Sequence, residues 1–95
     1  MGQRMIERRL RETGVRLRRL RAELAIVDEQ LSHLVDEAED KALRSLVSET
    51  SGAGMEYREA RLHADAMRQH RVHVQSSITE LETKQDELLD KLSRS

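Results

Sequence analysis

The apolar positions of the first half of the chain recur at alternating steps of four and three residues. They are Ile6, Leu10, Thr13 (a polar member), Leu17, Leu20, Leu24, Val27, Leu31, Leu34 and Ala38. This spacing is the seam of a heptad repeat, and it predicts a long amphipathic helix rather than a strand. The second half follows the same rule through Tyr57, Ala60, Ala64, Met67, Arg71, Val74, Ile78, Leu81, Gln85, Leu88 and Leu92. The pattern therefore predicts two helices that pack along one seam.

A short segment rich in small residues, Ser51-Gly52-Ala53-Gly54, separates the two heptad stretches. Glycine is the residue that most often ends a helix, and a short turn between long helices makes them antiparallel neighbours. We predict helix 1 over about 4–49, a turn over about 50–54 and helix 2 over about 55–93. The expected fold is all-α: a single domain, residues 1–95, forming an antiparallel two-helix coiled-coil hairpin.

The position of the turn predicts a register for the seam. In an antiparallel pair the numbers of facing residues have a constant sum, and pairing Leu24 with Leu81 and Leu17 with Leu88 gives 105 in both cases. Half of that value falls between Gly52 and Ala53, inside the expected turn. The same register brings Arg21 near Glu82 and leaves residues 1–9 without a partner in the hairpin.

Several apolar residues lie outside the seam, and two interpretations of them stay open. They are either single exposed side chains, which are normal on protein surfaces, or a second face. Such a face would be buried in a homodimeric four-helix bundle or against another protein, as small chains with little core often require. The residues concerned are Val15, Ala22, Ile26, Leu43, Val47, Leu62, Val72 and Leu89.

Composition supports helices and narrows the choice of cellular compartment. Charged residues make up 37% of the chain, Tyr57 is the only aromatic residue, and proline and cysteine are absent. Such a composition is typical of long helices, and without cysteine neither a disulfide nor a thiolate metal site can form. No apolar run approaches the roughly 18 residues of a membrane span, and the N-terminal segment lacks the apolar centre of a secretory signal. We expect a cytoplasmic protein.

No arrangement of residues predicts catalysis or a cofactor. His70 and His73 are one helical turn apart, but no neighbouring carboxylate completes a metal shell around them. The acidic run from Asp36 to Asp40 is typical of a solvated helix face. There is no phosphate-binding glycine loop and no serine in the setting of a nucleophile. We therefore expect no enzyme activity, no cofactor and no metal.

Charge is unevenly distributed, although the net charge of the chain is only −1. Residues 1–21 carry eight arginines against two glutamates, a local charge of +6. Arginines at this density bind phosphate groups well, but no aromatic residues are interleaved for base stacking. Nucleic acid is an alternative partner for this segment, and membrane binding is not expected.

Parts of the chain resemble known proteins. The segment Leu43–Asp90, with LRSLVSET, EYREARLHADAMRQHR and QDELLDKL, resembles small, uncharacterised helical proteins of actinobacteria, which implies no activity. The run Glu56, Tyr57, Ala60 and Arg61 is similar to the start of the second helix in the coiled-coil hairpin of Gre-type transcript-cleavage factors. Those factors insert the hairpin into the secondary channel of RNA polymerase, where acidic residues at its tip hold a catalytic metal.

This chain departs from the Gre pattern at the residues that matter most for cleavage. Thr50 and Ala53 stand where that family has its acidic residues, and the family's C-terminal docking domain has no counterpart in the sequence. The resemblance therefore implies a helical hairpin and, as an alternative function, association with RNA polymerase. It does not imply transcript cleavage.

We predict a non-enzymatic protein–protein interaction module: an adaptor, a small regulator or an assembly subunit that forms a homodimer. The alternative is a nucleic-acid- or RNA-polymerase-associated factor that uses the basic N-terminal segment or the hairpin tip. The candidate contact residues lie in the turn and in the basic segment, which the seam itself does not explain. They are Glu49, Thr50, Met55, Glu56, Tyr57, Arg4, Arg8, Arg9 and Arg11.

Overall fold

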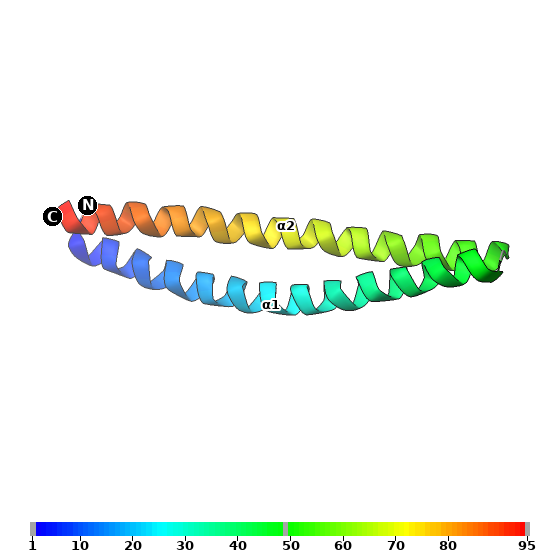
Figure 1. Cartoon of the computed structure of the whole chain (residues 1–95). Helices are drawn as coiled ribbons and strands as arrows, with labels where there is room; N and C mark the ends of the chain where they lie inside the picture. The colour runs from blue at the N-terminus through cyan, green and yellow to red at the C-terminus, as the bar shows by residue number, and fades with distance from the viewer. Residues whose placement is uncertain (1, 49, 95) are drawn as a thin grey trace. The chain divides into compact units, whose positions relative to one another are not determined.

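The computed structural model describes residues 2–48 and 50–94. They form two long helices, α1 (Gln3–Ser48) and α2 (Ser51–Arg94), and no strand occurs among the described residues (Figure 1). The fold class predicted from the heptad pattern is confirmed: the chain is an all-α helical hairpin. Each helix spans more than ten turns, because the chain has no proline to interrupt them.

The chain divides into two compact units, each containing part of both helices. The first unit consists of the described residues of Met1–Leu24 and His73–Ser95, and the second of the described residues of Ala25–Val72. Within each unit, a segment of α1 packs against a segment of α2.

The start of α2 differs from the prediction. The Thr50 hydroxyl accepts a hydrogen bond from the Ala53 N–H at 3.2 Å, and the Thr50 carbonyl accepts one from the Gly54 N–H at 3.2 Å. These are the bonds of a helix N-cap, so α2 begins at Ser51 and includes both Gly52 and Gly54. Neither glycine has a left-handed backbone. The predicted turn over 50–54 was therefore wrong for residues 51–54. The Thr50 cap starts the helix before the two glycines, which the helix tolerates in its first turns.

The core of the first unit shows that the predicted register was also wrong. Leu17 belongs to one buried cluster with Val74, Ile78 and Leu81, and Leu20 and Leu24 pack against that cluster. The predicted register placed Leu17 opposite Leu88 instead. Leu88 lies seven residues beyond Leu81, or about 10 Å along a helix, which is too far for both to face the same side chain.

The second unit supports the same correction independently. Arg71 of α2 donates a hydrogen bond to the carboxylate of Asp28 of α1. A side chain at Gly54 would lie 4.0 Å from the Ser45 hydroxyl. Both contacts join residues whose numbers sum to 99 instead of the predicted 105, so the facing positions lie about two helical turns from the predicted ones.

In the corrected register the N-terminal residues pack within the hairpin, whereas the predicted register left residues 1–9 without a partner. Ile6 is only 5% exposed, and Thr13 is buried with its hydroxyl donating to the Arg9 carbonyl at 2.8 Å. The N-terminal segment is therefore part of the first unit. The expected ion pair between Arg21 and Glu82 is confirmed at 3.2 Å, since long side chains on the flank of the seam reach past one turn.

The two units differ in how much large apolar surface they bury. The first unit buries six large aliphatic side chains: Ile6, Leu17, Val74, Ile78, Leu81 and Leu88. The second buries Val27 together with the small residues Ala60 and Ala64. The second unit therefore has the smaller core, and it also holds most of the exposed large apolar residues.

Candidate functional site

Exposed apolar side chains gather where α1 ends and α2 begins. Leu43, Leu46 and Val47 come from the last turns of α1, and Met55 comes from the second turn of α2. Leu43 is 63% exposed and Val47 is 85% exposed. Single exposed aliphatic residues are ordinary, but a group of them at one place is a candidate binding surface.

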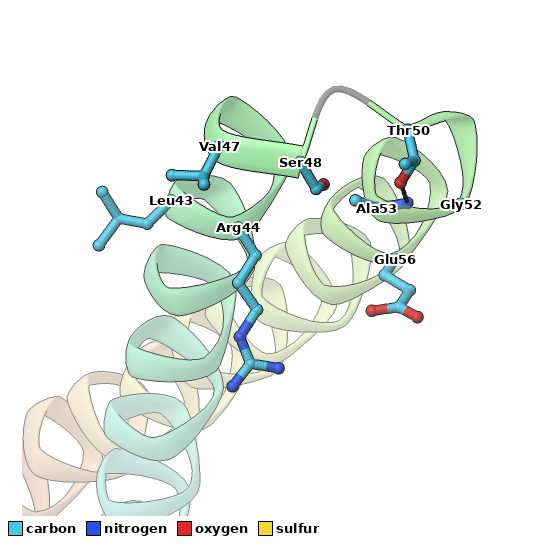
Figure 2. Close-up of a pocket in the computed structure, with 8 residues that line it drawn as sticks. All are labelled: Leu43, Arg44, Val47, Ser48, Thr50, Gly52, Ala53 and Glu56. Carbon is cyan, nitrogen blue, oxygen red and sulfur yellow. Dashed lines mark hydrogen bonds between the residues drawn. The ribbon is translucent and has the colours of Figure 1, made fainter.

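A hollow of about 590 Å³ lies beside this group, and we call it the junction hollow. Its lining residues are Leu43, Arg44, Val47, Ser48, Thr50, Gly52, Ala53 and Glu56. All eight belong to the second unit, and Figure 2 shows them around the end of α1 and the start of α2.

The two walls of the junction hollow have different shapes. Leu43 and Val47, one helical turn apart, project from the α1 wall (Figure 2). The α2 wall carries Gly52 and Ala53, and a Cβ added at Gly52 would meet no atom within 4 Å. The α1 side therefore presents two large apolar side chains, and the α2 side presents the small residues Gly52 and Ala53 between Thr50 and Glu56.

The walls also differ in charge. Arg44 on the α1 wall forms an ion pair of 3.1 Å with Asp40 of the same helix, and both side chains are largely exposed. Glu56 lies on the α2 wall, and none of the described residues forms an ion pair with it. An exposed pair within one helix contributes only a few tenths of a kcal/mol, so Arg44 remains available to a second carboxylate.

The structure separates the contact residues that the sequence predicted near the turn. Thr50 and Glu56 line the junction hollow. Tyr57 instead lines a second hollow of about 240 Å³, where the small side chains of Ala38, Ala42 and Ala64 leave space beside it. Met55 is exposed but lines neither of these two hollows, and Glu49 lies outside the described residues.

The predicted basic contact residues belong to the other unit. Arg4, Arg8 and Arg11 are exposed, whereas Arg9 is partly buried. Arg8 pairs with Glu12 at 3.3 Å, one helical turn away. These arginines therefore lie on α1, where Glu12 offsets the charge of Arg8. They do not lie on a segment without partners in the hairpin, as the sequence predicted.

Histidines line a further hollow of the second unit. His63 and His70 lie with Leu34, Ala66 and Met67 around a space of about 360 Å³. Among the residues that the structure describes, no group of three or more histidines or carboxylates is close enough to share a metal ion.

The α1 residues that line the junction hollow were not recognised as site residues from the sequence: Leu43, Arg44, Val47 and Ser48. Leu43 and Val47 were noted only as apolar residues outside the seam. The spacing of four residues between Leu43 and Val47 places both on one face of the helix, just before the threonine cap and the two glycines, and this signal could have found them.

Comparison with known proteins finds no matching family model, no matching curated protein and no matching solved structure. The resemblance of residues 56–61 to the Gre-type hairpin therefore stays a prediction. Among the described residues, neither helix contains a stretch that is both apolar and long enough for a transmembrane span.

Proposed function

We propose that this chain is a non-enzymatic protein-binding module that contacts its partner through the junction hollow. The observation that carries the proposal is the pair Leu43 and Val47, largely exposed on one wall of a hollow whose other wall includes the small residues Gly52 and Ala53. The module would serve as an adaptor, a small regulator or an assembly subunit. We place it in the cytoplasm, as the composition suggests.

The energetics favour a partner at this place. Burying an aliphatic side chain of this size stabilises a complex by about 1.5–3 kcal/mol. Leu43, Leu46, Val47 and Met55 are each 63–85% exposed, so together they offer several kcal/mol to a partner that covers them. The second unit buries few large side chains of its own, which leaves this surface as its main unused apolar area.

A nucleic-acid surface on the basic N-terminal segment has less support. Arg8 already pairs with Glu12, and Arg21 pairs with Glu82 of α2. Phosphate binding would compete with these carboxylates. It stays the alternative, and it predicts binding that weakens steeply with salt.

The test is affinity capture with three forms of the tagged full chain: the natural sequence, Leu43→Asp combined with Val47→Asp, and Val72→Asp as a matched control. Val72 is also more than half exposed in the same unit, but it lines neither hollow near the junction. We expect one protein to be enriched by the natural chain and by the control, and lost with the double variant. Nuclease treatment should leave the enrichment unchanged.

Two results would count against the proposal. Enrichment that survives the double variant would place the contact elsewhere on the chain. Enrichment that disappears with nuclease would favour the alternative function. Far-UV circular dichroism on each form verifies that the helices are intact.

A further inference from the structure

We infer that the protein bound at the junction hollow is a second copy of this chain, docked about a two-fold axis so that the two junction hollows face each other. The inference rests on the proposed function and names its partner. A two-fold contact requires a self-complementary surface, on which each feature meets its opposite in the other copy. The junction hollow meets this requirement in both shape and charge.

The shape argument concerns the unequal walls. Leu43 and Val47 project from the α1 wall, whereas the α2 wall carries the small residues Gly52 and Ala53, with open space beside Gly52. A two-fold rotation brings the α1 wall of one copy onto the α2 wall of the other. The large side chains of each copy then fill the open space of its partner, as knobs fill holes between packed helices.

The charge argument concerns Arg44 and Glu56. They lie on opposite walls of the same hollow, and among the described residues Glu56 has no ion-pair partner. The same rotation that pairs the apolar walls brings Arg44 of each copy toward Glu56 of the other. Two ion pairs then flank the apolar contact, and they fix the antiparallel arrangement of the walls.

The available area predicts a weak, reversible dimer. At roughly 60–120 Å² of apolar surface for a fully exposed side chain of this size, the exposed fractions of Leu43 and Val47, the two large apolar residues that line the hollow, amount to about 90–180 Å² per copy. Stable complexes bury about 800 Å² per partner, and weaker ones bury less. We therefore expect a monomer–dimer equilibrium that depends on concentration.

The first experiment is sedimentation equilibrium on the full chain, from about 1 µM to about 1 mM, a range that spans weak to moderate affinities. The natural chain and the Val72→Glu control should pass from monomer to dimer over this range. Leu43→Glu combined with Val47→Glu should remain monomeric throughout. A natural chain that stays monomeric at every concentration would overturn the inference.

The second experiment reverses each of the two charges, and it distinguishes a contact between two copies from a contact within one chain. Arg44→Glu and Glu56→Arg each place like charges together twice across the two-fold axis, and each should raise the dissociation constant about ten-fold or more at low salt. An equimolar mixture of the two variants places opposite charges together at both positions. The mixture should therefore form a heterodimer with an affinity close to that of the natural homodimer.

A contact within one chain cannot restore association in the mixture, because each chain in the mixture still carries two like charges at positions 44 and 56. If the mixture dimerises no better than either variant, the two-fold arrangement is overturned. Arg44 is largely exposed and so is Glu56, so both variants should keep their helices. The charge test therefore decides the question even if the double apolar variant fails to fold.

The outcomes also separate this inference from the proposed function. A monomeric natural chain that still captures a different protein through Leu43 and Val47 would end the inference and leave the proposed function standing. If the double variant changes neither self-association nor capture, both are overturned.

Discussion

Replacing Leu17 by alanine should destabilise the protein more than any change at an exposed apolar residue. Leu17 is 1% exposed and is the largest fully buried side chain among the described residues. It lies in the cluster formed with Val74, Ile78 and Leu81, against which Leu20 and Leu24 pack. Removing it therefore takes contacts from both helices of the first unit at once.

The magnitude follows from two contributions. Losing three buried carbon groups at about 0.8 kcal/mol each removes about 2.4 kcal/mol of transfer free energy. A cavity adds to this loss, and substitutions of this kind span about 2–5 kcal/mol. Leu20 and Leu24 are only partly buried and can move inward, so we expect a value near the lower end, about 2.5–3.5 kcal/mol.

Urea denaturation followed by far-UV circular dichroism measures this free energy of unfolding directly. The same loss should lower the melting temperature by roughly 10–28 °C, at about 4–8 °C per kcal/mol for a domain of this size. Leu62→Ala is the control, because Leu62 is 67% exposed and should lose less than about 0.8 kcal/mol. If the two variants lose equal stability, the assignment of the core of the first unit is wrong.

Three further changes test the helices and their register. Gly14→Ala should stabilise the protein by about 0.5–1 kcal/mol in the same denaturation assay, since a Cβ there makes only ordinary contacts; a loss of stability would mean that the site is more crowded. Thr50→Ala should cost about 1 kcal/mol by removing the cap of α2, and an unchanged melt would place the helix start elsewhere. The chain has no cysteine, so Leu24→Cys paired with Val74→Cys should form a disulfide on oxidation without loss of helix. Leu24→Cys paired with Leu81→Cys should not form one, because Leu81 lies a heptad beyond the residue that faces Leu24, and the two Cα atoms are then farther apart than the roughly 7 Å limit for bridging. A disulfide in this second pair would restore the register predicted from the glycines.

The helices were predictable from the sequence because every heptad repeats the same information. Ten or more positions in each half carry the seam, so a single polar member such as Thr13 or Arg71 does not obscure it. The register was not predictable by the same means, because a seam shifted by seven residues still places apolar residues opposite one another. Only the position of the turn distinguishes the two registers.

The turn itself depended on a choice between two local signals. Gly52 and Gly54 suggested a break, whereas Thr50 offered a cap three residues before Ala53. Glycine is tolerated near a helix start at modest cost, and a capping hydroxyl satisfies a backbone N–H that would otherwise lack a partner. The cap signal was present in the sequence, and giving it more weight would have placed the turn correctly.

The junction hollow was only partly predictable. Thr50 and Glu56 were chosen because they lie near the turn, and both line the hollow. Leu43 and Val47 were missed, since their role depends on which small residues stand across from them. That relation is set by the register, so the error in the register concealed the α1 wall of the hollow.

The small core of the second unit has a consequence for how the protein moves. With Val27, Ala60 and Ala64 as its buried apolar residues, this unit gains less free energy from closing its two helical segments than the first unit does. Its backbone amides should exchange with solvent through local opening at lower free energy than those around Leu17. A partner at the junction hollow would bind the closed form and slow that exchange by mass action. Deuterium uptake by the second unit would then report occupancy of the hollow, with the first unit serving as the internal reference.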